Sequence, residues 1–514
     1  MLTTSSLYAK ISMSDPHDWL SIASTQKGYA LMYDYDVLII GCGISGAAAA
    51  YMLARYDLKT GIIERSNDVA NGTTKANSAI LHAGYDPAPG SLMARLNRRG
   101  ISMARDICRR LDIEYRPMPS LVIAFNERDM NEIHRLYERG IANGVSVRIL
   151  SREEALAVEP SLNPDVVGAL FSDESAIVNP WEYATAMAET AVLNGTELML
   201  EQLVTGIEKN EDGTLTVITD QGSFRTRFIV NAAGCFAGDI CRMVGDDRIT
   251  QTNYAGQYYV LDKSEGARVG SVIFRCPDEN GFKGILVTPT VHGNLLVGPD
   301  ASPVSDGDNT ATDSATLAML KKRGLESVPG INFREVIHEY AGVRPTTQYK
   351  NFIIDVSPAC PQLINLAGIC SPGLSAAPAI GEEAVRLLAE QGLELKERAD
   401  FKDTRPPVIR FAELSEEEKQ RVAAEKPAYG RIVCRCETVT EGEIVDAIHR
   451  PIVPRSVDAI KRRCRAGMGR CQGGFCSPRV HAILARELGV PMTEITLDSQ
   501  GSFILTGCTK GADN

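Results

Sequence analysis

The feature that most constrains this chain is a glycine pattern placed between two short apolar runs. Val37–Ile40 is a largely β-branched run, as expected of a parallel strand buried on both faces. Gly41, Gly43 and Gly46 follow directly in the spacing G-x-G-x-x-G, and the residues after them predict a helix. A second apolar run then ends at Glu64. This strand, turn, helix and strand with an acidic end is typical of a dinucleotide-binding unit.

Each residue of the pattern has a physical role. Gly41 permits the tight turn, Gly43 lets the backbone approach a pyrophosphate, and Gly46 allows close helix–strand packing. The helix N-terminus offers free N–H groups to the anion, and Glu64 would accept hydrogen bonds from an adenosine ribose. A glycine-rich turn without a ligand is the alternative, and Glu64 argues against it.

Composition excludes several classes of protein. With 514 residues and 44% apolar content, the chain is long enough for two to four domains with real cores. A net charge of −11 argues against a nucleic-acid partner. The uncharged run 37–54 contains the glycine turn and is therefore expected to be buried in a soluble domain rather than in a membrane. Residues 1–31 do not resemble a secretory signal, and we expect them to be either a disordered extension or a misassigned start.

Further candidate cofactor contacts follow along the chain. Gly368–Gly381 predicts a second glycine turn opening a helix, whose N-terminal dipole would stabilise negative charge on a reduced cofactor. His82 lies just downstream of the dinucleotide motif and is either a structural or a catalytic histidine. The remaining predicted cofactor contacts are Thr73, Thr74, Ser78, Val204, Gly234, Gly373 and Leu374.

Residues 254–300 alternate as strands do, and together with 121–174 they predict a separate, mainly antiparallel sheet that roofs the cofactor. Arg344, just before Pro345, would be a bidentate clamp for an anionic substrate on this sheet. The alternative for Arg344 is a structural ion pair.

The C-terminal part contains a cysteine pattern of its own. Cys434 and Cys436 form a Cys-x-Cys pair, and Cys471 and Cys476 lie in a glycine-rich segment further on. Four thiolates can hold zinc or an iron–sulfur cluster. The spacings differ from zinc knuckles, and the glycines leave N–H groups free for bridging sulfides, so a [2Fe–2S] cluster is favoured. Cys464 is interpreted as a helix residue, in a module of three helices that has no core without its metal.

These patterns divide the chain into five parts: an extension (1–31), an oxidoreductase region (32–398), a charged linker (399–430), a metal-binding domain (431–490) and a C-terminal tail (491–514). The fold class is α/β, with a Rossmann-like cofactor domain and an inserted α+β substrate domain. The cofactor parts are predicted at 32–120, 175–250 and 335–398, and the substrate parts at 121–174 and 251–334.

Residues 34–398 resemble the D-amino-acid-oxidase-like flavoproteins, particularly anaerobic glycerol-3-phosphate dehydrogenase large subunits and L-2-hydroxyglutarate oxidases. Residues 431–490 resemble the bacterioferritin-associated-ferredoxin-like [2Fe–2S] domain, on the motifs that surround Cys434–Glu437 and Gly467–Cys476. The resemblance implies FAD at the glycine motif, His82 beside the flavin and Arg344 on the substrate anion. One departure is the run His82-Ala-Gly-Tyr-Asp86, in which the glycerol-phosphate enzymes carry an arginine. Lys350 is a candidate substitute.

We therefore predict an FAD-dependent dehydrogenase that oxidises sn-glycerol 3-phosphate to dihydroxyacetone phosphate and passes electrons through a [2Fe–2S] cluster to a flavin or iron–sulfur partner subunit. The alternatives are a 2-hydroxyacid dehydrogenase, oxidation of an amine, and a non-catalytic electron-transfer module. Thirteen cysteines in a chain without a secretory signal predict a reducing, cytoplasmic location. We expect no direct membrane span, with any membrane association made through the partner.

Overall fold

A mixed eight-stranded sheet carries the glycine motif. The computed structural model describes residues 33–277 and 284–507, so the expected extension at 1–31 lies outside the described residues. β1 (Tyr35–Ile40) pairs in parallel with β2 (Thr60–Ile63) and with β12 (Ser223–Asn231), and β12 pairs in parallel with β20 (Cys360–Ala367). The other strands are β9 (Glu197–Met199), β10 (Val204–Lys209), β11 (Leu215–Thr219) and β19 (Ile353–Ser357). The predicted Rossmann-like sheet is confirmed.

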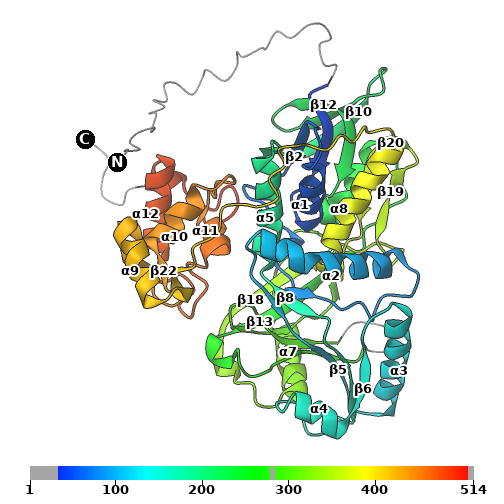
Figure 1. The fold of residues 1–514 in the computed structure, drawn as a ribbon, viewed down its shortest axis with the longest axis vertical. Helices are drawn as coiled ribbons and strands as arrows, with labels where there is room; N and C mark the ends of the chain where they lie inside the picture. The colour runs from blue at the N-terminus through cyan, green and yellow to red at the C-terminus, as the bar shows by residue number, and fades with distance from the viewer. Residues whose placement is uncertain (1–32, 278–283, 508–514) are drawn as a thin grey trace, which may run out of the picture. The chain divides into compact units, whose positions relative to one another are not determined.

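Helices cover both faces of this sheet. Alternate residues of β1 point to opposite sides, and because both sets are apolar, both faces need to be covered. Val37 and Ile39 pack into a core shared with α1 (Ile44–Leu53), α2 (Leu92–Arg110), α5 (Pro180–Leu193) and α8 (Gly373–Glu390). Leu38 and Ile40 pack on the other side with α6 (Ala237–Met243). Helices α1, α5 and α8 are grouped beside the sheet in Figure 1. The strand is therefore buried on both faces, as its continuous apolar run predicts.

The second sheet has nine strands, and every pair in it is antiparallel except β5–β14. It confirms the predicted mainly antiparallel sheet. Its strands are β5 (Ser120–Ala124), β6 (Arg148–Ser151), β7 (Gly168–Ser172), β13 (Tyr254–Leu261), β14 (Val272–Arg275), β15 (Leu286–Pro289), β16 (Leu295–Gly298), β17 (Ser302–Pro303) and β18 (Val336–Arg344). Helices α3 (Glu127–Ala142), α4 (Arg152–Val158) and α7 (Ser314–Ser327) accompany it. A three-stranded sheet of β3 (Ile80–Leu81), β4 (Tyr115–Pro117) and β8 (Ala176–Val178) completes this part.

The boundary predicted at residue 335 is wrong. β18 pairs with β13 along its whole length, so residues 336–344 belong to the second sheet. The chain returns to the first sheet only at β19, which pairs with β20. A half-exposed strand has the same sequence pattern in either sheet. The sheet to which it belongs is therefore known only once its pairing partner is known.

The C-terminal module contains the helices predicted for it. They are α10 (Glu441–Ile448), α11 (Val457–Cys464) and α12 (Ser477–Leu488), beside a hairpin of β21 (Ile432–Cys434) and β22 (Val439–Thr440). Ile444, Ile460, Val480 and Leu484 are fully buried in one cluster. The expectation that the module has no core without its metal is therefore wrong.

Residues 399–430 are not an open linker. The acidic run after Ser415 begins α9 (Glu416–Glu425), where Ser415 and Glu418 form a capping box. Tyr429 is buried and donates to the Asp446 carboxylate at 2.7 Å. Arg405 is buried between Glu182 and Glu189. Charge and proline content pointed to a linker, but the charges cap a helix and form ion pairs.

Part of the predicted tail, 491–514, is ordered as well. Ile495 is buried in the core of the module, and Thr496 forms isolated bridges with Ser456 and Phe503. No helix of the described residues is long and apolar enough to cross a membrane.

Candidate active site and cysteine loop

A cavity of about 1360 Å³ is lined by residues of both large sheets. It brings together predicted residues that are far apart in the sequence. Those lining it are Gly41, Gly43, Glu64, Thr73, Thr74, Ser78, His82, Val204, Gly234, Arg344, Lys350, Gly373 and Leu374. Gly46 lies behind the wall, within α1. The positions fit the predicted roles, which remain predictions.

The three motif glycines meet different neighbours. Gly41 has φ +96°, and a Cβ there would lie 2.6 Å from the carbonyl oxygen of Ala232. A Cβ on Gly46 would lie 2.0 Å from the carbonyl oxygen of Gly41, so only glycine lets α1 pack against the turn. A Cβ on Gly43 would meet only the Thr74 hydroxyl, at 3.3 Å. Gly43 is therefore the position with room for a ligand.

Glu64 connects the turn to the end of β2. Its buried carboxylate accepts hydrogen bonds from the backbone N–H groups of Cys42 and Ser66, both at 2.8 Å. These bonds fix the carboxylate in the cavity wall, and each carboxylate oxygen retains capacity for another donor.

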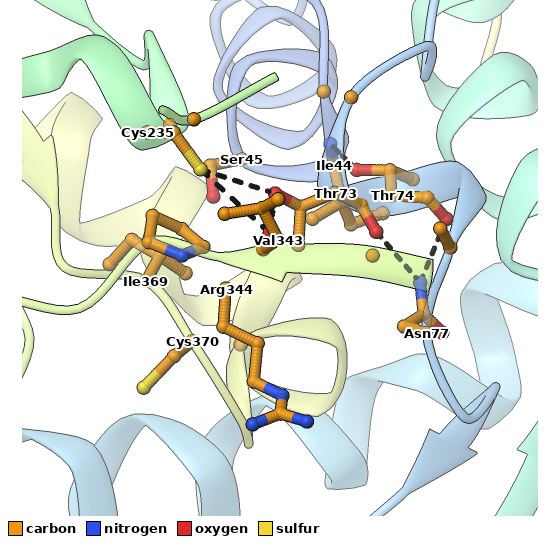
Figure 2. Close-up of a pocket in the computed structure, with 18 of the residues that line it drawn as sticks. Ile44, Ser45, Thr73, Thr74, Asn77, Cys235, Val343, Arg344, Ile369 and Cys370 are labelled. Carbon is orange, nitrogen blue, oxygen red and sulfur yellow. Dashed lines mark hydrogen bonds between the residues drawn. The ribbon is translucent and has the colours of Figure 1, made fainter. Parts of the chain in front are cut away.

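The loop after β2 joins the two sheets at the cavity. The backbone N–H of Ile44, at the start of α1, donates to the Thr74 hydroxyl at 2.9 Å. Thr73 donates to the carbonyl oxygen of Val343 at 2.6 Å, and the Asn77 amide donates to the carbonyl of Thr74 at 2.8 Å. Figure 2 shows this loop lying against β18. The second sheet is thus held directly against the glycine turn.

His82 is positioned by hydrogen bonds at its backbone and its ring. Its N–H donates to the Ser375 hydroxyl at 2.7 Å, and its carbonyl accepts from the Asn97 amide at 3.2 Å. Its Nε2 lies 3.1 Å from the Ser371 hydroxyl, and its ring centroid lies 5.7 Å from that of Phe274. The imidazole is therefore held at the wall beside the start of α8, whose N-terminus has no side-chain cap.

Arg344 ends β18 and extends away from Thr73 and Thr74 (Figure 2). Its guanidinium donates to the carbonyl of Asp300. Gly256 makes room for it, since a Cβ there would lie 2.1 Å from Arg344 Nη2. Among the described residues no carboxylate forms a salt bridge with Arg344, so the structural ion-pair alternative has no partner there. The arrangement fits an anion clamp.

Tyr258 lies between these elements. Its hydroxyl is 2.9 Å from that of Ser78, and its ring stacks on Tyr340 with centroids 4.7 Å apart. Burial raises the pKa of Tyr258, although the nearby Arg344 acts in the opposite direction. The phenol is therefore neutral at physiological pH and can act as a donor. Lys350 is exposed at the cavity lining, with φ +49°.

The four predicted cysteine ligands lie in two segments that meet, Cys434–Cys436 and Cys471–Cys476, which together are called the cysteine loop. The sulfurs of Cys436 and Cys471 are 3.7 Å apart, close to the ~3.8 Å expected of two thiolates on one tetrahedral metal. A hydrogen bond with Cys476, together with backbone N–H groups that include that of Gly467, lowers the pKa of Cys434 to about 6. A Cβ on Gly469 would lie 2.2 Å from that of Cys436.

Two findings bear on the choice of metal. No three His, Cys, Asp or Glu side chains in the described residues converge to hold a single ion. The thiols instead form two pairs, which fits a cluster with two irons better than one zinc. Cys464 lies in α11, as predicted, and its thiol contacts the Ile460 carbonyl at 3.4 Å.

The sequence reasoning missed several wall residues. Ser371 could have been found, because it lies within the predicted turn Gly368–Gly381, two residues before Gly373. Tyr258 and Asp300 lie in alternating strands and loops, where a single sequence gives no signal of which side faces the ligand. Asp498–Gln500 also line the cavity, although nothing near them in the sequence indicates it.

Residues 36–387 match the family model of the FAD dependent oxidoreductases, and residues 432–486 match the BFD-like [2Fe-2S] binding domain. The chain belongs to this family: it is an FAD-dependent oxidoreductase with a [2Fe–2S] domain, and its cofactors are FAD and a [2Fe–2S] cluster.

More particularly, it is 46% identical to a glycerol 3-phosphate dehydrogenase of Caloramator mitchellensis, over 93% of this chain and 99% of that one. The structure of dithionite-reduced L-α-glycerophosphate oxidase from Mycoplasma pneumoniae with FAD bound superposes with a TM-score of 0.69 at 35% identity, covering 72% of this chain and 99% of that one. An L-2-hydroxyglutarate dehydrogenase of Escherichia coli is 28% identical over 52% of this chain and 64% of its own.

The cavity fits FAD on its own geometry. The open approach at Gly43, the fixed carboxylate of Glu64 and the uncapped start of α8 provide contacts for a pyrophosphate, a ribose and an electron-rich ring. The cysteine loop fits the cluster through its paired thiols and converging N–H groups.

Proposed function

We propose that this protein oxidises sn-glycerol 3-phosphate to dihydroxyacetone phosphate and passes the electrons through its [2Fe–2S] cluster to a partner protein. The observation that carries the proposal is the convergence of His82 and Arg344 in one cavity with the dinucleotide turn. The similarity to a glycerol 3-phosphate dehydrogenase and to a glycerol 3-phosphate oxidase supports the choice of substrate.

Arg344 would bind the anionic end of the substrate, because its guanidinium extends from β18 into space that Gly256 leaves open. His82 would then accept the hydroxyl proton at a ring nitrogen, as the carbon-bound hydrogen leaves as hydride. Ser371, 3.1 Å from His82 Nε2, would orient the imidazole or relay the proton. FAD, when bound, supplies the hydride acceptor.

The [2Fe–2S] cluster, when bound, supplies a one-electron carrier for transfer to the partner. The ligands we propose for it are Cys434, Cys436, Cys471 and Cys476. The partner is expected to be another flavin or iron–sulfur subunit, because a simple oxygen-using oxidase has no need of a cluster. Any attachment to a membrane would be made through that subunit.

The first test is anaerobic. Glycerol 3-phosphate is added to the purified holoprotein while the flavin band and the paramagnetic signal of the cluster are recorded. Bleaching of the band followed by a reduced-cluster signal is the expected result. Folded protein that carries flavin but is reduced by no substrate would favour a non-catalytic electron-transfer module and overturn the enzymatic proposal.

Two variants test the residues. His82→Gln is expected to slow substrate-driven flavin reduction by about a hundredfold or more. Arg344→Ala is expected mainly to raise KM, because it removes binding of the anion. The matched controls are His134→Gln and Arg334→Ala, both on the exposed surface, and these should behave as the wild type. If the rate of substrate-driven flavin reduction falls by less than about tenfold in both test variants, the catalytic assignment of His82 and Arg344 is wrong.

A 2-hydroxyacid is the second candidate substrate. Its supporting observation is Asp86, which lines the cavity in the stretch where the glycerol-phosphate enzymes have an arginine. A carboxylate there disfavours a phosphate dianion more than a single carboxylate. A panel of 2-hydroxyacids and amino acids decides between the candidates: faster flavin reduction by one of them than by glycerol 3-phosphate would replace the proposed substrate.

A further inference from the structure

A short segment beyond the [2Fe–2S] domain reaches the flavin cavity. Asp498, Ser499 and Gln500 lie after the last helix of the module, and all three line the cavity. They stand beside the loop that follows β2, whose Ser66 and Asn67 line it as well. The C-terminal module thus contributes part of the cavity wall.

Asp498 makes the contacts that hold this segment in place. Its carboxylate binds Lys75 Nζ at 3.0 Å and Arg462 Nη1 at 3.0 Å, and its carbonyl accepts from the Asn67 amide. Burial alone would raise the pKa of Asp498, but Arg462 and Lys75 outweigh it and the pKa is lowered. Asp498 is therefore charged at neutral pH and connects α11 of the module to the wall of the flavin cavity.

The segment is itself part of a closed turn. The N–H of Asp498 donates to the Ser502 hydroxyl at 3.0 Å, and the N–H of Leu497 donates to the Ser502 carbonyl at 2.8 Å. The N–H of Asp458, at the start of α11, donates to the carbonyl of Leu497 at 2.8 Å. Because the turn is bonded to α11, movement of the module would move the wall.

The contacts place this wall near the dinucleotide end of the cavity. Glu64 accepts the N–H of Ser66, directly before Asn67. Lys75 belongs to the short helix Thr73–Lys75 that supports the start of α1 through Thr74. Asp498 thus contacts both ends of the loop that begins after Glu64 and supports the start of α1.

We propose that residues 498–500 form a wall of the FAD site contributed by the iron–sulfur module, so that retention of FAD and docking of the module stabilise each other. Asp498 is a positioning residue, acting through Lys75 and Asn67. If FAD stabilises the docked wall, the docked wall must stabilise bound FAD by the same factor. Most of the cavity belongs to the flavin domain, so the effect is a change in affinity rather than a loss of binding.

The test measures FAD affinity in the full-length protein after removal of the flavin, by titration with FAD and quenching of its fluorescence. Asp498→Ala is expected to raise the Kd for FAD by about tenfold. The matched control is Arg450→Ala. Arg450 also bridges the module to the flavin domain, through Glu189 at 3.0 Å, but neither of these two residues lines the cavity.

An unchanged Kd in Asp498→Ala would overturn the proposal, and so would an equal rise in Arg450→Ala, since that would reflect loose docking in general. A second measurement uses unmodified protein and so does not depend on how a variant folds. Addition of FAD should slow hydrogen exchange at the amides of Leu497 and Asp498 while leaving α12 unchanged. No slowing there would contradict the coupling. Neither readout involves substrate, so failure here is distinguishable from failure of the proposed reaction.

Discussion

The flavin cavity and the cysteine loop are built in different ways. In the cavity, polar side chains are fixed by groups from distant elements: Glu64 by the glycine turn, and Thr73 by β18. Cores on both faces of the first sheet support them. In the cysteine loop, the thiols contact one another and nearby N–H groups, and Cys436 is exposed. The cavity wall is therefore fixed by hydrogen bonds and cores of the fold, whereas the thiols depend on bound metal to hold them together.

The largest expected effect comes from removing one thiol, which tests whether the cysteine loop and the flavin cavity respond differently. Cys436→Ser should abolish the paramagnetic signal of the [2Fe–2S] cluster, because a serine oxygen is a poor replacement for a thiolate ligand of iron. The FAD content, read from the flavin absorbance, should not change. Cys464→Ser is the control and should retain both cofactors. Complete loss of FAD along with the cluster would mean that the flavin cavity depends on the cluster for its fold, rather than only for part of its FAD affinity.

The last two glycines of the motif allow the effects on folding and on FAD binding to be separated. Gly46→Ala places a Cβ 2.0 Å from a backbone carbonyl, so we expect the free energy of unfolding to fall by about 3 kcal/mol or more. Gly43→Ala meets only a hydroxyl at 3.3 Å, and its effect on unfolding should be within about 1 kcal/mol. It should instead weaken FAD binding. Denaturant unfolding of the flavin-free proteins and FAD titration measure the two effects.

The contact between the two regions depends on a buried carboxylate. Asp68 is bound by Arg462 at 3.1 Å and by Arg463 at 2.7 Å. Removing one partner of a buried pair leaves an uncompensated charge. Asp68→Asn should therefore lower the free energy of unfolding by about 3 kcal/mol at pH 7. Asp106→Asn, on the exposed side of α2, is the control and should not shift the denaturant midpoint.

The same pair gives a pH dependence with a defined sign. Burial would raise the pKa of Asp68, but Arg463 and Arg462 outweigh it and lower the pKa below the ordinary 3.8. A lowered folded-state pKa adds stability that is present above 3.8 and is lost as the pH falls through the lower value. The difference between wild type and Asp68→Asn should thus be constant from about pH 5 to 8 and shrink below about pH 4. A difference that changed between pH 6 and 8 would point to another titrating group.

The sequence predicted the parts of the molecule whose chemistry is local. The glycine turn, its flanking strands and the helices of the module follow from periodicity and from residues close together in the chain. The partner of β18 could not be predicted, because strand pairing depends on contacts far apart in sequence. Residues 399–430 were interpreted as a linker for a related reason. Arg405 forms ion pairs with Glu182 and Glu189, which lie far upstream in the sequence, while the acidic run forms a capping box.

The residues of the candidate site also fall into those predicted from local sequence and those that depend on packing. His82 and Arg344 were predicted because each stands beside a recognisable turn or proline. Tyr258 and Asp498 were not, since their relation to the cavity exists only after the two sheets and the module have packed. The packing of Ile495 and Thr496 within the predicted tail was not foreseen either, because a single polar turn gives no sequence signal of what it contacts.

The smallest expected effect is on KM, for a residue at the exposed rim of the cavity, where side chains are not held by the surrounding fold. Lys350 is exposed, so water screens its charge and one contact with an anion contributes about 0.5–1 kcal/mol. Lys350→Ala should therefore raise KM by about two- to fivefold without changing kcat. If Lys350 replaces the missing arginine, the rise should be larger for glycerol 3-phosphate than for a 2-hydroxyacid, because a phosphate carries more charge. Lys209→Ala, on an exposed strand end away from the cavity lining, is the control. An equal rise for both substrates would show that Lys350 does not read the phosphate.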